Sequence, residues 1–341
     1  MARSSEIRSF LLKEIPRHSQ DVVTFAAMKF NVARMTIYRH LQKLVKQNQV
    51  VQTGEKRGVE YFLNTALERV LRFKIASGLE EADVWSQYFK TPFQKLPKNI
   101  LDICEYGFTE MFNNAKEHSE GTDIIVEKSW SKHHMMINLL DNGVGVFQKL
   151  QRAFHFQDMR EGMLALSKGK LTTDPNNHTG EGIFFTSRIF DVFQLSANGL
   201  CYLRDNVEND FSISEDKISC GTRVYMKIAR DSRRDLVEIF KNFQGGEENL
   251  SFTKTEVLVK LSQFGEDRFV SRSQAKRIVR GLEKFEHVKF DFRDVEMVGQ
   301  GFVDEVFRVF QNKYPKIKIE YVNAVGNVEF MVKRGIDTGK G

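Results

Sequence analysis

Long apolar segments are absent from this sequence. No run approaches the ~20 consecutive apolar residues that a helix needs to span a bilayer, so we expect no membrane-spanning helix and no membrane partner. The first 15 residues form an amphipathic pattern interrupted by charges, which is not the pattern of a signal peptide. We therefore expect a cytoplasmic protein.

Cysteine and proline are also scarce. The three cysteines (Cys104, Cys201 and Cys220) are odd in number and none belongs to a C-x-x-C pair. This argues against a disulfide framework and against a structural zinc site. With five prolines, 41% hydrophobic and 28% charged residues, the 341-residue composition is typical of a globular chain. The length suffices for two or three domains.

The net charge of +6 is concentrated in one part of the chain. Residues 1–65 carry 11 Lys and Arg against 5 Asp and Glu, whereas the remaining 276 residues carry 40 of each kind. A neutral body with one small basic module suggests that the module binds a polyanion.

This basic segment has the element order of a winged helix. Apolar residues at helical spacing and then two strand-like runs predict helices at residues 7–15, 22–28 and 32–45 and strands at 50–52 and 59–63. The link between the second and third helices is short, as a helix-turn-helix requires. The loop between the strands has glycines at both ends and two cations, Lys56 and Arg57, at its tip.

The third predicted helix resembles the recognition helix of bacterial winged-helix transcription regulators. Its N-terminal part offers Arg34, Thr36, Tyr38 and Arg39. These residue types reach phosphates and base edges in a major groove, and Lys56 and Arg57 would lie on the wing. The resemblance implies a DNA-binding domain over residues 1–65. The alternative is a basic three-helix domain that binds another protein.

The middle of the chain contains three separated motifs, of which the first is E-x-x-x-N-A on a predicted helix. Glu110 and Asn114 are four positions apart, so both side chains project from one face of the helix. An Asn oxygen can ligate Mg²⁺. A carboxylate one turn earlier can hold and deprotonate an attacking water or hydroxyl. Taken alone, the pattern also fits any solvated helix face.

The second motif is D-x-G-x-G, from Asp141 to Gly145, directly after a predicted strand. A carboxylate at the end of a strand can accept a hydrogen bond from the amino group of adenine. Gly143 and Gly145 let the backbone approach the base closely and adopt a positive φ. Taken alone, this motif is more often a simple turn.

The third motif is G-x-G, at Gly180 and Gly182, where an amphipathic helix begins. Backbone N–H groups at such a helix start suit phosphate oxygens. The ~30 residues before it contain Lys168 and Lys170, and their composition suits a mobile lid over a triphosphate. A later Gly-Thr pair, with Thr222, precedes another predicted strand.

In this order and spacing the motifs resemble the GHKL ATPases, which share the Bergerat fold of gyrase B, Hsp90, MutL and bacterial sensor and anti-sigma kinases. The first motif is most similar to that of the anti-sigma serine kinases. The resemblance implies that residues 66–235 bind ATP and Mg²⁺, with Glu110 as the base and Asn114 as the magnesium ligand. It also implies that Asp141 anchors adenine with support from Thr222. Glu117 or His118 would be a polar residue that supports the residues in contact with the nucleotide and the magnesium ion.

Residues 250–335 alternate between helix and strand patterns. Ser271 to Gln274 predicts a capping box, and the pattern resembles the STAS-like domains appended to some bacterial GHKL proteins. That resemblance implies a protein partner or a homodimer contact. In related antagonists a serine before a helix receives phosphate, but residues 298–301 contain no hydroxyl, so we do not expect phosphorylation there. Asp304 and Glu305 are expected to charge a helix start.

The predicted fold class is α+β with three domains: a winged helix, a Bergerat α/β sandwich with a mixed sheet and helices on one face, and a small STAS-like α/β domain. Three functions stay open: an ATP-responsive DNA-binding regulator, a protein kinase of the anti-sigma type, and a clamp ATPase. They differ in whether the γ-phosphate stays on ATP, moves to a protein side chain, or moves to water. A sensor histidine kinase is not favoured, because residues 64–100 contain no histidine.

Overall fold

The computed structural model divides the chain into two compact units, one holding residues 1–71 and the other holding nearly all of residues 72–341. The residues that it describes are all except 1, 16–17, 48, 54–58, 64–69, 90–92, 94–95, 132, 247–248, 263–268, 270 and 339–341. Lys56 and Arg57 therefore lie outside the described residues. No helix in the described ranges is both long and apolar enough to cross a membrane.

The smaller unit consists of three helices followed by a two-stranded antiparallel sheet. Its elements are α1 (Ala2–Glu14), α2 (Val22–Phe30), α3 (Arg34–Lys46), β1 (Val50–Thr53) and β2 (Glu60–Leu63). Asn31 ends α2 in the left-handed conformation, with φ of 47°, which short polar side chains tolerate. On α3, Ile37, Leu41 and Leu44 are buried at helical spacing, so this helix packs its apolar face into the core of the unit.

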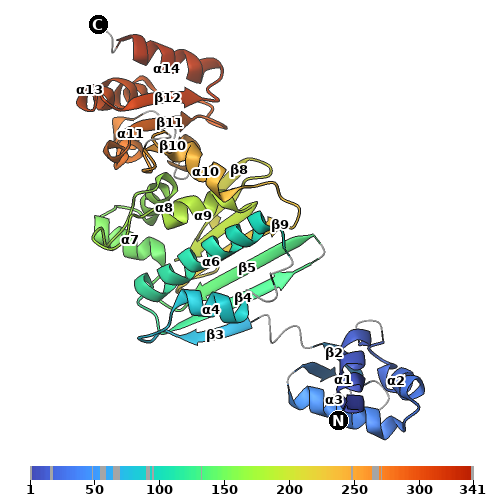
Figure 1. The fold of residues 1–341 in the computed structure, drawn as a ribbon. Helices are drawn as coiled ribbons and strands as arrows, with labels where there is room; N and C mark the ends of the chain where they lie inside the picture. Colours follow the sequence, from blue (N-terminus) through green and yellow to red (C-terminus); the bar gives the residue numbers. More distant parts are fainter. Residues whose placement is uncertain are drawn as a thin grey trace. The chain divides into compact units, whose positions relative to one another are not determined.

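A seven-stranded sheet forms the centre of the larger unit, with the order β3-β4-β5-β9-β6-β7-β8 (Figure 1). The strands are β3 (Val70–Lys74), β4 (Asp123–Trp130), β5 (His134–Asp141), β6 (Val192–Ala197), β7 (Leu200–Asp205), β8 (Asp210–Glu215) and β9 (Thr222–Ala229). Along β5, buried and half-buried residues alternate, as expected for a strand with two different faces.

The sheet is antiparallel, whereas the sequence led us to expect a mixed one. The pairs β5–β9, β9–β6, β6–β7 and β7–β8 all run antiparallel. For β6, β7 and β8 short connections account for this, because parallel neighbours need a long crossover. The link from β6 to β7 is a two-residue turn, Asn198-Gly199, with both residues at positive φ, which favours a tight hairpin.

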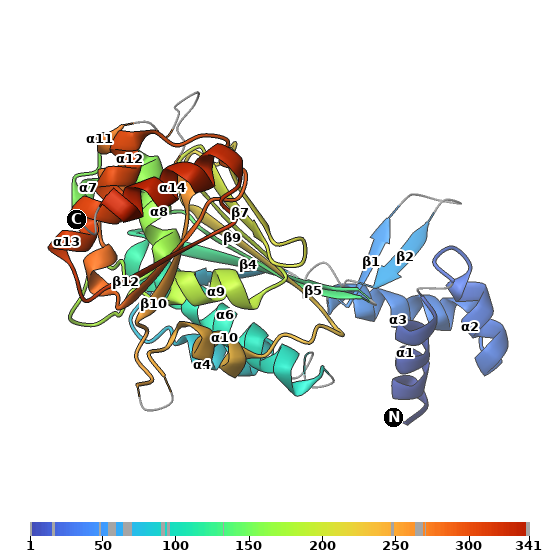
Figure 2. The ribbon, with the colours of Figure 1, turned by 90° about the horizontal axis from the view of Figure 1, so that it is seen from above.

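Helices α4 (Glu81–Tyr88), α6 (Lys98–His118), α9 (Gly182–Ile189) and α10 (Leu236–Phe243) lie on one side of this sheet (Figures 1 and 2). The longest of them, α6, buries residues at intervals of three and four from Ile100 to Ala115, the spacing of one helical face. Gly107 lies within this face, and a Cβ there would come within 2.3 Å of the Phe190 ring. The glycine therefore allows α6 to approach the end of α9 closely.

The C-terminal part of the larger unit is built on a second, parallel sheet. Its strands are β10 (Lys254–Leu258), β11 (His287–Asp291) and β12 (Lys318–Val322), in the order β10-β11-β12. Its helices are α11 (Arg272–Val279), α12 (Gln300–Asp304), the π-helical turn η4 (Glu305–Phe310), α13 (Gln311–Lys313) and α14 (Gly326–Thr338), with short 3₁₀ turns at Val259–Ser262 and Leu282–Lys284. The predicted capping box is confirmed: Ser271 and Gln274 cap the first turn of α11 reciprocally.

Aromatic rings join the two sheets into one unit. Phe184 and Phe185 of α9 contact Phe252, which in turn contacts Phe285 near β11. Phe243 of α10 packs against the same group. These contacts pack residues 250–335 against the elements of the seven-stranded sheet, and both belong to the larger compact unit.

Candidate functional site

A cavity opens between α6, the end of β5 and the residues that precede α9. It holds about 1000 Å³ of empty space, a figure that includes the open solvent at its mouth. Residues from the predicted motifs that line it are Glu110, Asn114, Asp141, Gly180, Gly182 and Thr222. Its apolar wall includes Leu139, Leu195 and Val224, all from the sheet.

Asp141 is the last residue of β5 and is only 4% exposed. Its Oδ1 accepts hydrogen bonds from Gly143 N at 2.9 Å and Thr222 N at 3.2 Å. Burial raises the pKa of this carboxyl, although the bonds from Gly143 and Thr222 oppose the rise. The side chain is therefore fixed by the backbone of its own turn and by that of Thr222, 81 positions further along the chain.

Glycines make the close approach around Asp141 possible. A Cβ on Gly143 would lie 1.9 Å from Ser119 O, and one on Gly221 would lie 2.0 Å from Asp141 O. Gly145 has a φ of 82° and faces the Asn198 side chain. Gly143 and Gly145 thus shape the turn that carries Asp141 but are not among the residues that line the cavity.

Glu110 and Asn114 face the cavity from successive turns of α6. Burial raises the pKa of Glu110, the nearby Glu181 carboxylate raises it further, and His178 opposes both. The Asn114 side chain makes no hydrogen bond to another described residue, so its amide is available to the cavity. A carboxyl with a raised pKa beside a polar amide is a candidate for proton transfer.

The third motif lies against α6 at the position of Glu110. A Cβ on Gly182 would lie 2.2 Å from Glu110 Oε2, so a larger residue at the start of α9 would displace this carboxylate. Gly180 has a φ of 72°, and a Cβ there would collide with the backbone of Leu171. The structure thus places parts of all three motifs, which are spread over residues 110–182, around one space.

Lys168 and Lys170 are not among the residues that line this cavity. Lys168, at the end of α8 (Met159–Lys168), is 3% exposed and donates to Arg277 O at 3.3 Å and Arg280 O at 3.1 Å in the C-terminal segment. Burial lowers its pKa to about 7. Lys170 donates to Lys284 O at 2.9 Å. Both lysines therefore bind the C-terminal segment instead of the empty space beside α9.

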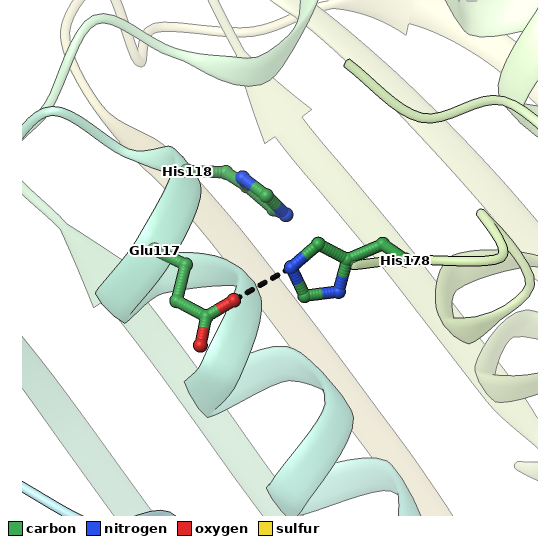
Figure 3. Close-up of side chains that lie close together, drawn as sticks. All are labelled: Glu117, His118 and His178. Carbon is green, nitrogen blue, oxygen red and sulfur yellow. Dashed lines mark ion pairs between the residues drawn. The ribbon is translucent and has the colours of Figure 1, made fainter. Parts of the chain in front are cut away.

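Three further polar side chains lie close together, and two of them, His118 and His178, line the cavity (Figure 3). Glu117 and His118 end α6, and His178 precedes α9; Glu117 Oε2 and His178 Nε2 are 2.7 Å apart. Burial lowers the pKa of His118, with His178 and Lys149 adding to the effect. The sequence pointed to Glu117 or His118 as a supporting polar group, but it gave no role to His178. Its position two residues before Gly180 was the available signal.

In the smaller unit, the candidate DNA-contacting side chains lie on α3. Arg34, Tyr38 and Arg39 are exposed and Thr36 is half-buried. Arg34 also donates to Thr24 Oγ1 on α2. The exposed side of α3 therefore carries cations while its opposite side packs into the core.

Comparison with known proteins identifies one part of the chain. Residues 274–329 match the family model of the STAS-like domain of unknown function (DUF4325). The C-terminal segment is STAS-like. A search of curated proteins finds no match to the chain. Within the STAS-like segment, Asp304 pairs with Arg272 and Arg308, and Gly299 occupies the position before α12.

Proposed function

We propose that the cavity beside α6 binds ATP with Mg²⁺, and that the protein is a regulator in which the nucleotide controls DNA binding by residues 1–65. The observation that carries the proposal is the meeting of three motifs at one cavity. Asp141 stands at its inner end, Gly180 and Gly182 lie where α9 begins, and Glu110 lies between them. This set combines an apolar wall, a buried acceptor and backbone donors, which is what an adenine nucleotide requires.

Asp141 is the proposed acceptor for the adenine amino group. Its Oδ1 is occupied by the N–H groups of Gly143 and Thr222, so these bonds hold the carboxylate in one orientation. The neighbouring Leu139 and Val224 provide flat apolar surface for the base. Adenine would then be distinguished from guanine, which presents a carbonyl oxygen where adenine has its amino group.

Asp141→Asn is expected to weaken ATP binding about 30-fold, corresponding to ~2 kcal/mol for leaving a buried polar group with the wrong partner. The asparagine can orient an N–H₂ group toward the adenine amino group, which also donates. Calorimetric titration of both proteins with ATP and Mg²⁺ measures the effect, with Asp231→Asn, an exposed carboxylate after β9, as the control. Equal ATP affinities for wild type and Asp141→Asn would remove Asp141 as the adenine acceptor.

Asn114 is the proposed ligand of Mg²⁺. Its amide lines the cavity without another described residue as a partner, and an amide oxygen is a suitable donor for a hard cation that retains most of its waters. When bound, Mg²⁺ would neutralise charge on the phosphates. Glu110, one turn earlier, is placed to hold a nucleophile and accept its proton.

Contacts of the segment before α9 support a link between nucleotide and STAS-like segment. Lys168 and Lys170 donate to carbonyl oxygens of Arg277, Arg280 and Lys284, and Thr255 Oγ1 donates to Lys168 O at 2.6 Å. The same segment leads directly to Gly180. Movement of the segment on nucleotide binding would therefore change its hydrogen bonds to the STAS-like segment. We propose that a protein partner or a second copy binds the surface of that segment.

The proposed DNA-binding surface is the exposed side of α3, in a segment of the winged-helix type. Arg34 and Arg39 are exposed there, and the segment carries the whole net positive charge of the protein. Three helices and a hairpin place such a helix for insertion into a major groove.

Arg39→Ala is expected to lower affinity for duplex DNA several-fold and to reduce the slope of log K against log salt by about one unit, if one phosphate contact is lost. Fluorescence anisotropy at several salt concentrations gives both quantities. Lys241→Ala, an exposed cation on α10, is the matched control and should leave the slope unchanged. An unchanged slope for Arg39→Ala would argue against docking of α3.

A further inference from the structure

Two imidazoles from residues that line the cavity, His118 and His178, converge with one carboxylate, Glu117. Glu117, His118 and His178 each offer one ligand atom, and these atoms lie within 4.8 Å of one another (Figure 3). The two histidine rings face each other edge to face, with centroids 4.6 Å apart. Both histidines are half-buried and Glu117 is exposed, so the cluster is accessible from solvent.

We propose that Glu117, His118 and His178 form a binding site for a divalent transition-metal ion of the zinc class. Two histidines and a carboxylate are a typical ligand set for Zn²⁺, with a fourth position left to water. Imidazole nitrogen favours transition metals, whereas Mg²⁺ favours oxygen ligands. This site is therefore chemically separate from the oxygen site at Asn114, and it does not depend on nucleotide binding.

The separation of the ligand atoms is close to what such an ion needs. Zinc bonds of about 2.0–2.2 Å at tetrahedral angles place ligand atoms roughly 3.3–3.6 Å apart. To bind the ion, Glu117 Oε2 and His178 Nε2, now 2.7 Å apart, would separate slightly. The ligand nitrogen of His118, now within 4.8 Å of the other two ligand atoms, would move closer to them. These are changes that side-chain rotation can supply without movement of the helix.

Neighbouring cations are held by other partners. Lys149 Nζ donates to His118 O at 2.7 Å and pairs with Glu120 at 3.2 Å. Lys116 pairs with Glu81 at 3.0 Å, whereas its distance to Glu117 is 4.0 Å. The Glu117 carboxylate thus has its shortest ion pair with His178, the group that would share the metal ion.

A bound ion would connect two segments that are distant in sequence. Glu117 and His118 lie at the C-terminal end of α6, and His178 lies in the segment that leads into Gly180 and α9. The metal would therefore fix the end of this segment against α6. Since an ion that binds the folded state stabilises it by mass action, zinc should also raise the melting temperature of the protein.

The test uses the full chain, stripped with a chelator and free of nucleotide. Titration with Co²⁺ should give the visible absorption of a four-coordinate ion, and Zn²⁺ should displace it with a stoichiometry of one. Glu117→Gln and His178→Ala should each weaken Zn²⁺ binding at least 10-fold and abolish the rise in melting temperature. His133→Ala/His134→Ala removes the same number of imidazoles as a His118→Ala/His178→Ala double variant and should bind Zn²⁺ like the wild type.

Two results would overturn the proposal: no Zn²⁺ binding below millimolar concentration in the wild type, or equal binding in wild type and the His118→Ala/His178→Ala variant. Glu117→Gln keeps the size of the side chain, so it serves if the histidine variants fold poorly. Asp141→Asn should retain Zn²⁺ binding. That variant separates the metal site from the nucleotide site, because loss of ATP affinity alone would leave the metal proposal intact.

Discussion

Replacement of Glu110 by glutamine is expected to lower ATP turnover by about 10²- to 10⁴-fold, the usual contribution of a positioned general base. Nucleotide affinity should change little, because glutamine keeps the shape of the side chain beside Gly182. Since the pKa of Glu110 is raised mainly by burial, its basic form is populated above that raised pKa. Wild-type turnover should therefore increase with pH, with a midpoint above the ordinary carboxyl pKa of 4.5, and the variant should lack this dependence.

Incubation with γ-labelled ATP and Mg²⁺ measures this effect and also separates the possible reactions. Label in free phosphate indicates hydrolysis, and label on the protein indicates a kinase. Glu105→Gln, an exposed carboxylate on the same helix, is the matched control and should behave as the wild type. Turnover that survives in Glu110→Gln would exclude this residue as the base.

Replacement of Glu256 by alanine is expected to destabilise the larger unit by about 2 kcal/mol, the scale for removing a hydrogen-bonded charged partner. Glu256 on β10 lies 2.7 Å from Lys289 Nζ and 3.6 Å from the Arg204 guanidinium on β7. Arg188, which is 3% exposed on α9, also interacts with it. Without Glu256, these cations would face one another at the join between the two sheets.

Glu256 should also make this contribution pH-dependent. Burial acts to raise the pKa of its carboxyl, but Arg188, Lys289 and Arg204 outweigh burial and hold the pKa below its ordinary value of 4.5. A carboxyl with a depressed folded-state pKa stabilises the fold above its unfolded pKa and loses this effect as the pH falls through the folded value. The difference between wild type and Glu256→Ala should thus be complete at pH 7 and shrink below about pH 4.5.

Urea unfolding followed by tryptophan fluorescence reports on this unit, since Trp85 and Trp130 both belong to the chain from residue 72 onward. Glu320→Ala is a suitable control, because its pair with Lys318 on β12 is largely exposed and should contribute less than about 1 kcal/mol. A Glu256→Ala midpoint equal to that of the control would show that the charge cluster contributes nothing to the contact between the sheets.

Local sequence patterns predicted the features that depend on interactions between residues close in sequence, such as a helix cap and a strand. The capping box at Ser271 and Gln274 needs only four residues, and it is present. The strand before Asp141 was visible as an apolar run, and it ends at Asp141. Each of these depends on backbone hydrogen bonds or side-chain periodicity within one element.

Lys168 and Lys170 have partners that local patterns do not reveal. Their composition and place between two motifs suggested phosphate binding, but their hydrogen-bond partners Arg277, Arg280 and Lys284 lie 109 to 114 positions further along the chain. Nothing local marks a lysine that is buried by such a distant segment. The pairing of His178 with Glu117 is hidden for the same reason, since it arises only when the segment before α9 folds onto α6.

Helix α14 was not predicted either, and packing explains why. It contains Gly326 and Gly335, which weaken helix propensity in isolation. A Cβ on Gly335 would lie 2.2 Å from the Val303 side chain of α12. The glycine thus permits a close contact between two helices, a benefit that is not apparent from the sequence of α14 alone.

The central claim is that ATP occupies the cavity formed by α6, the end of β5 and the start of α9. Backbone hydrogen exchange with and without ATP and Mg²⁺ tests it directly, since it reports where binding slows amide exchange. The account predicts increased protection around residues 141–146 and 180–186 and in the C-terminal half of α6, and no such protection in Asp141→Asn at the same ATP concentration. Unchanged exchange in these segments at saturating ATP, or protection confined to other parts of the chain, would contradict it.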